Sequence, residues 1–159
     1  MNAPEMFQLQ ISRFIRAPRE KVFDAFVTEA LLSQWKSPRG MKVAACSVDA
    51  RVGGRYRVEM RSREGTTFAV GGTYTALNRP ERLAYTWQWQ GENPMAGFET
   101  LIEVDFIAKD GGTELRMKHS GFPAVAARDG HSQGWSSSLN RHNDLLDPRG
   151  SAATITLLG

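Results

Sequence analysis

The chain has 159 residues, of which 41% are hydrophobic and 23% are charged, and its formal net charge is +3 at pH 7. This length and composition are typical of one globular domain with its own hydrophobic core. The basic residues are scattered and form no long run, which argues against a nucleic-acid-binding tract.

Cysteine use and the N-terminal residues favour a cytoplasmic protein. Cys46 is the single cysteine, so no disulfide can form within the chain, as expected in a reducing compartment. Residues 1–17 lack the continuous apolar segment of a signal peptide. No apolar run approaches the roughly 18 residues of a membrane-spanning helix. We therefore expect a soluble protein with neither membrane nor nucleic acid as a partner.

The first elements are predicted to be one strand and two short helices. Apolar and polar residues alternate over residues 7–15, which predicts a strand, although Arg13 and Phe14 interrupt the pattern. Pro18 suits the first position of a helix whose apolar residues form one stripe. Thr28 can cap a second short helix that ends after Trp35.

Six further strands are predicted to follow in hairpin succession. Each segment alternates apolar and polar residues and is separated from the next by turn residues, such as Gly53-Gly54 and Asp110-Gly111-Gly112. The predicted strands span about residues 41–48, 55–61, 68–76, 83–90, 102–107 and 114–119. This regular spacing predicts an antiparallel meander, whose apolar face needs a cover.

A long helix from about Ala124 to Leu146 is the predicted cover. Trp135 and Leu139 fall on its apolar stripe. Gly134 costs about 1 kcal/mol compared with alanine, which suggests a close approach to the sheet or a ligand, or a local bend. Asp147-Pro148 is expected to end the helix.

The residues after this helix are predicted to form a separate extension. We expect residues 1–148 to form a single domain and residues 149–159 to form a short strand or extended tail. This tail is predicted to pack on a sheet edge or on a neighbouring subunit. Both a monomer and a homodimer fit this expectation.

Eight different short motifs occur along these elements, each of them once. They are Ala17-Pro18-x-x-x-Val22-Phe23, Trp35, Gly53-Gly54-x-Tyr56, Gly72-x-Tyr74, Pro80-x-x-Leu83-x-Tyr85-x-Trp87, Thr113-x-Leu115, His119-Ser120-Gly121-Phe122 and Arg128-x-x-His131-x-x-Gly134-Trp135-x-x-x-Leu139. Over about residues 7–146, this order and spacing resemble the bacterial relatives of the activator of the Hsp90 ATPase, in the START/Bet v 1-like superfamily.

The resemblance implies an α+β helix-grip fold, also called Bet v 1-like. A curved antiparallel sheet of about six or seven strands wraps a long C-terminal helix, and two short helices after the first strand close one end. Between sheet and helix lies a cavity that is often hydrophobic. The superfamily includes lipid carriers, polyketide cyclases, hormone binders and co-chaperone domains, so the fold alone does not select a function.

The candidate ligand-binding residues lie on the inward strand faces and on the long helix. They are Trp35, Tyr56, Met60, Tyr74, Trp87, Trp89, Phe106, Met117, His119, His131, Trp135 and Leu139. They could line a pocket for a small apolar or aromatic ligand, in which the tyrosine hydroxyls form hydrogen bonds that orient the ligand. Alternatively, they form the core of a small curved sheet.

The histidines raise the question of catalysis. His119 and His131 could act as a general base at the cavity mouth, or each could bind backbone near the strand-to-helix turn. Without a placed carboxylate the pair is a weak catalytic signal. His142 lies too far along the helix from His131 to share a metal ion with it. We therefore assign no catalytic residue, metal or cofactor.

Three functions stay open. The first is binding of a small hydrophobic or aromatic ligand, and the second is an enzyme of the polyketide cyclase or hydratase type on the same fold. The third is a co-chaperone that stimulates an Hsp90-type ATPase. The third is weakened because the eukaryotic activator resembles this chain only through its C-terminal domain.

Overall fold

A computed structural model of the chain describes residues 6–91, 96–147 and 153–158. Strands and helices follow one another in the predicted order. The elements are β1 (Phe7–Ile15), α1 (Arg19–Val27), α2 (Glu29–Trp35), β2 (Met41–Val48), β3 (Arg55–Ser62), β4 (Thr67–Asn78), β5 (Arg82–Gln90), β6 (Thr100–Lys109), β7 (Gly112–Phe122), α3 (Val125–Leu146) and β8 (Ala153–Leu158).

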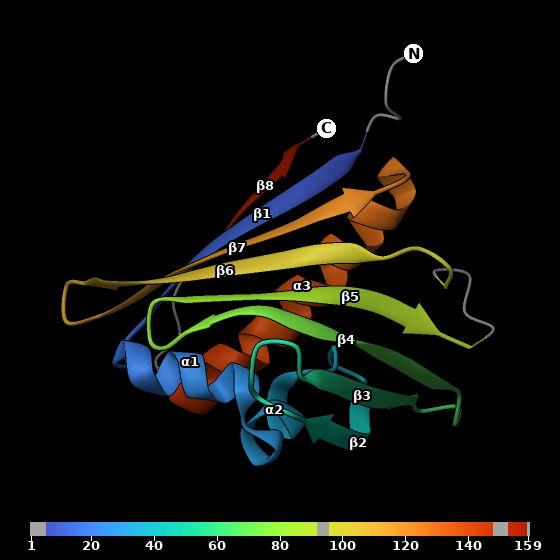
Figure 1. The fold of residues 1–159 in the computed structure, drawn as a ribbon, viewed down its shortest axis with the longest axis horizontal. Coiled ribbons are helices and arrows are strands. Elements are labelled where there is room, and N and C mark those ends of the chain that lie inside the picture. The colour runs from blue at the N-terminus through green and yellow to red at the C-terminus, as the bar shows by residue number, and fades with distance from the viewer. Residues whose placement is uncertain (1–5, 92–95, 148–152, 159) are drawn as a thin grey trace.

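The strands form one antiparallel sheet, in the order β2-β3-β4-β5-β6-β7-β1-β8. Helix α3 crosses one face of this sheet, and α1 and α2 lie near its C-terminal end (Figure 1). The six-strand meander from β2 to β7, with β1 beside β7, the two short helices after β1 and the long C-terminal helix confirm the predicted α+β helix-grip fold.

The C-terminal extension adds an eighth strand to the predicted six or seven. β8 pairs with the outer edge of β1, from Gln8 opposite Leu158 to Arg13 opposite Ala153. The expected packing on a sheet edge is therefore confirmed. The predicted boundary between domain and extension, at residues 148–149, lies outside the described residues.

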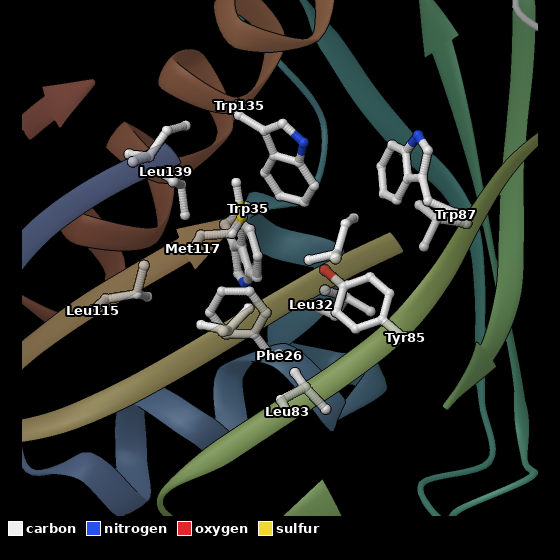
Figure 2. Close-up of a cluster of buried hydrophobic side chains, with 14 of the residues drawn as sticks. Phe26, Leu32, Trp35, Leu83, Tyr85, Trp87, Leu115, Met117, Trp135 and Leu139 are labelled. Carbon is white, nitrogen blue, oxygen red and sulfur yellow. The ribbon is translucent and has the colours of Figure 1, made fainter. Parts of the chain in front are cut away.

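Alternation of side chains places the core between the sheet and α3. On β3, Tyr56, Val58 and Met60 are buried, whereas Arg55 and Arg57 are exposed. β6 and most of β7 follow the same alternation, since successive side chains point to opposite faces, whereas β4 and β5 each contain three consecutive buried residues. Figure 2 shows side chains from α1, α2, the strands and α3 meeting in one cluster. Each large apolar side chain buried there contributes about 1.5–3 kcal/mol.

Arg13 explains the interruption in the first strand. Its side chain points inward and is buried, and its Nη1 donates to Oδ1 of Asn143 on α3 at 3.3 Å. Close by, the backbone N–H of Arg16 donates to the Asp147 carboxylate at 2.9 Å. Polar contacts therefore join β1 to the C-terminal end of α3.

Helix α3 is 22 residues long and mixes apolar residues with glycine, serine and histidine. Within the described residues, no helix combines the length and the apolar character needed to cross a membrane.

Candidate functional site

A pocket of about 260 Å³ opens beside the N-terminal half of α3. Its surface is mostly carbon. Figure 2 shows two of its walls, Trp135 extending from α3 and Trp87 opposite it on β5. The lining residues come from α3, from β3 and β5, and from the segment after α2. They are Lys36, Pro38, Met60, Trp87, Trp89, Gly130, His131, Gly134, Trp135 and Ser138.

Two glycines one turn apart leave α3 open on this side. A Cβ atom added at Gly130 would meet nothing within 4 Å, and one at Gly134 would meet only Pro38, with its Cγ at 4.0 Å. Of the alternatives expected for Gly134, a close approach to the sheet is therefore wrong, whereas a close approach to a ligand stays a prediction. Both glycines instead border the pocket, and Gly130 is exposed at its rim.

His131 has hydrogen-bond partners at both ring nitrogens. Its Nε2 lies 2.9 Å from Nε1 of Trp89 and 3.3 Å from Nε1 of Trp87. An indole N–H only donates, so Nε2 must accept and Nδ1 must carry the proton. Nδ1 then donates to the carbonyl oxygen of Ala127 at 2.7 Å. Burial lowers the pKa of His131, although the Ala127 carbonyl acts in the opposite direction, so the ring is neutral.

His119 completes a chain of hydrogen bonds behind the pocket. Trp135 Nε1 donates to its Nδ1 at 3.0 Å, so its Nε2 carries the proton and donates to the Thr100 hydroxyl at 2.6 Å. That hydroxyl donates to the carbonyl oxygen of Trp87 at 3.1 Å. Burial lowers the pKa of His119 well below 6.5, and the nearby His131 and Lys36 lower it further.

The two histidine rings do lie together, with centroids 5.2 Å apart. The expected position of both at the cavity mouth is wrong for His119, which is fully buried. The backbone contact expected for each is found at His131 but not at His119, whose ring nitrogens contact the side chains of Thr100 and Trp135. With both nitrogens of each ring engaged, the pair orients Trp87, Trp89 and Trp135 and leaves no lone pair for a general base.

Lys36 is a pocket residue that sequence reasoning missed. The residue is 3% exposed, and its Nζ lies 4.0 Å from the ring centroid of Trp135 and 4.7 Å from that of Trp87. It donates to the Tyr85 hydroxyl at 3.3 Å. Burial lowers the pKa of Lys36 well below 10.5. Lysines are seldom buried, so a lysine that directly follows a helix gives no sign in the sequence of pointing inward.

The predicted site residues divide into two groups. Five line the pocket: Met60, Trp87, Trp89, His131 and Trp135. The others belong to the packed interior around it: Trp35, Tyr56, Tyr74, Phe106, Met117, His119 and Leu139. Burial raises the pKa of Tyr56 and Tyr74, so both remain neutral phenols. Contact of any of these residues with a ligand stays a prediction.

Comparison with known proteins identifies the family. Residues 16–147 match the family model described as "Activator of Hsp90 ATPase homolog 1-like protein", abbreviated AHSA1. The chain belongs to the AHSA1 family. The match ends at Asp147, so β8 lies beyond it. No curated protein matches the chain significantly.

Solved structures support the AHSA1 assignment. Protein CV1439 from Chromobacterium violaceum is 27% identical, with 89% of this chain and 99% of that one covered and a TM-score of 0.81. The AHSA1 protein SPO3351 from Silicibacter pomeroyi is also 27% identical, with the same coverage and a TM-score of 0.78. An uncharacterised protein from Rhizobium leguminosarum, at 24% identity, has the same fold, with 91% and 96% of the two chains covered and a TM-score of 0.78.

The described part of this AHSA1 protein holds no cluster of three or more histidine, cysteine or acidic side chains placed to bind a metal ion. The polar groups at the pocket are instead the buried amine of Lys36, the imidazole of His131 and the hydroxyl of Ser138. The Ser138 hydroxyl donates to the carbonyl oxygen of Lys36 at 3.1 Å. The pocket therefore combines aromatic walls with a single basic amine.

Proposed function

We propose that this AHSA1 protein binds a small hydrophobic or aromatic molecule in the pocket between α3 and the sheet. The observation that carries the proposal is the hollow of about 260 Å³ walled by Met60, Trp87 and Trp135. Small-molecule sites are typically concave and mostly apolar, with volumes from roughly 300 Å³ upward. This pocket is near the lower limit, so a ligand with one or two rings fits best.

The hydrogen bonds around the pocket favour binding over catalysis. The indoles of Trp87, Trp89 and Trp135 each donate to a histidine nitrogen, which fixes the orientation of three large flat walls. Walls that are already ordered lose little entropy when a ligand enters. An enzyme of the polyketide cyclase or hydratase type gains no support from these histidines, because their nitrogens are occupied.

Tryptophan fluorescence and native mass spectrometry test the proposal. Indoles that line the pocket should change their emission when naphthalene or biphenyl compounds are added, and native mass spectrometry should detect a co-purified small molecule. The blocking variant is Gly134→Leu, which projects a side chain into the pocket from a position with room for it. The matched control is Gln133→Leu, at an exposed neighbouring position.

We expect Gly134→Leu to lose most of the fluorescence response and Gln133→Leu to keep it. Flat titrations of the unsubstituted protein across the whole panel, or full binding by folded Gly134→Leu, would refute a ligand site here. Circular dichroism of both variants checks that the fold is retained.

The family description supports a second candidate, stimulation of an Hsp90-type ATPase. The test is the ATP turnover of a bacterial Hsp90 with increasing amounts of this protein. A saturable rise would support a co-chaperone role, and an unchanged rate at excess protein would remove it.

A further inference from the structure

Lys36 is a buried base without an acidic neighbour in the described part of the chain. Its residue is 3% exposed, and its Nζ makes one hydrogen bond, to the Tyr85 hydroxyl. Besides burial, the influence on its pKa comes from the Cys46 thiol, which raises it, and among the described residues no carboxylate forms an ion pair with its Nζ. Lysines buried to this degree are almost always paired, so the missing counter-charge needs an explanation.

Aromatic rings surround the amine on several sides. Its Nζ lies within 4.0–5.4 Å of the ring centroids of Trp35, Tyr85, Trp87 and Trp135. The faces of such rings attract a cation, so the cage can hold an ammonium group. An ammonium group has three N–H donors, and Tyr85 accepts only one of them. The protonated amine of Lys36 therefore has further N–H groups that could donate to a ligand in the apolar pocket.

We propose that the pocket recognises a small aromatic or aliphatic carboxylic acid, whose carboxylate pairs with Nζ of Lys36 while its apolar body lies against Trp87 and Trp135. This inference rests on the proposed ligand-binding function and names the class of ligand. One amine balances one carboxylate, which favours a monoacid over a phosphate with two charges. Access is from the rim at Gly130, which is exposed and offers no side chain to block entry.

The protonation states are consistent with this assignment. Carboxylic acids are already ionised at pH 7, so the ligand enters as a carboxylate, and an amine that burial keeps unprotonated takes up its proton from water as the ligand binds. Binding then places a carboxylate and an ammonium group in contact. The phenol of Tyr85 keeps its proton, because burial raises the pKa of Tyr85 well above 10. Tyr85 therefore acts as a positioning residue for the amine.

Matched pairs of acids and amides test the inference. The probes are phenylacetic acid, 3-phenylpropionic acid and 1-naphthylacetic acid, each compared with its primary amide by calorimetric titration at pH 7. A charge-assisted contact predicts that the protein binds each acid at least about tenfold more tightly than the amide. Lys36→Met keeps an apolar side chain of similar length and should abolish this preference while still binding the amides.

Tyr85→Phe gives a second, milder variant. It removes only the hydroxyl that holds the amine and should reduce the acid preference without abolishing it. Equal affinity for acids and amides in the unsubstituted protein, or an undiminished acid preference in folded Lys36→Met, would overturn the role of Lys36 and leave the proposed ligand binding intact. Failure of every acid and amide to bind would overturn both.

Discussion

The two halves of α3 face the same sheet but differ in how they meet it. Around Gly130 and Gly134 the helix borders a hollow, whereas around Leu139 and His142 the interior is filled. The His142 ring lies 4.8 Å from that of Trp35 and 5.2 Å from that of Phe26, by centroids. Both halves carry polar residues, so polarity does not separate them. The difference lies at Gly130 and Gly134, where no side chain from α3 or from its neighbours fills the space.

The histidines of the two halves also differ. His131 at the pocket has partners on both nitrogens, whereas His142 is packed between aromatic rings. Burial lowers the pKa of His142 to about 3, outweighing the backbone of Val22, which favours the protonated form. Both rings are neutral mainly because burial disfavours their charged forms. Burial has the same effect on His119 beside the pocket, so acid should weaken both halves.

The largest expected difference between the halves comes from truncating large side chains. Trp35→Ala should lower the free energy of unfolding by about 3–5 kcal/mol, because it empties filled space and removes the bond from its indole to the Ala25 carbonyl. Met60→Ala, which only widens the existing pocket, should cost nearer the lower limit of about 2 kcal/mol. Urea denaturation measures both. Equal losses would show that the two halves are packed alike.

Acidification gives the next largest effect. The unfolded chain binds a proton at His142 below pH 6.5, but the folded chain does so only near pH 3. The unfolded state therefore holds more protons in this window, and stability falls as the pH falls. His142 alone should account for a loss of about 3 kcal/mol between pH 7 and pH 4.

His142→Phe isolates this contribution, since its ring can occupy the same site without titrating. The variant should lose less stability than the unsubstituted protein between pH 7 and pH 4, when urea midpoints are measured at each pH. Parallel losses in the two proteins would mean that other groups carry the acid sensitivity.

The smallest expected effect concerns the pocket glycines. Gly134→Ala should raise the free energy of unfolding by up to about 1 kcal/mol, because alanine favours the helix and its Cβ has room. The contrasting variant is Gly72→Ala on β4, whose Cβ would collide with the backbone of Thr86. Thermal melting should show the first rising and the second falling. A fall in Gly134→Ala would mean that the helix needs glycine there for a reason other than space.

The sequence predicted most of the fold because strand alternation and turn residues are local signals. The alternation of Tyr56, Val58 and Met60 with arginines is enough to orient β3. The predicted succession of a strand ending at His119, a turn and a helix carrying His131 also placed these two histidines close together, as the structure has them. The sequence could not reveal that both ring nitrogens of His131 are engaged in hydrogen bonds. Two of its partners are indoles on β5, a strand distant in the chain.

The pocket was harder to predict than the core. Trp35, Trp87 and Trp135 carry the same apolar signal, yet only the last two border the hollow. The position of a void depends on the sum of neighbouring side-chain volumes, which no single stretch of sequence contains. Lys36 was missed for a related reason, since its inward direction is set by how α2 ends against α3.

Strand β8 has a consequence for self-association. Unpaired strand edges are templates for joining a second chain, and β8 occupies the edge of β1 that would otherwise be open. A chain shortened to Asp147 would offer that bare ladder of amides and carbonyls to any other copy. In the intact chain β8 is the edge strand in its place, and its six residues offer a shorter template than the nine of β1.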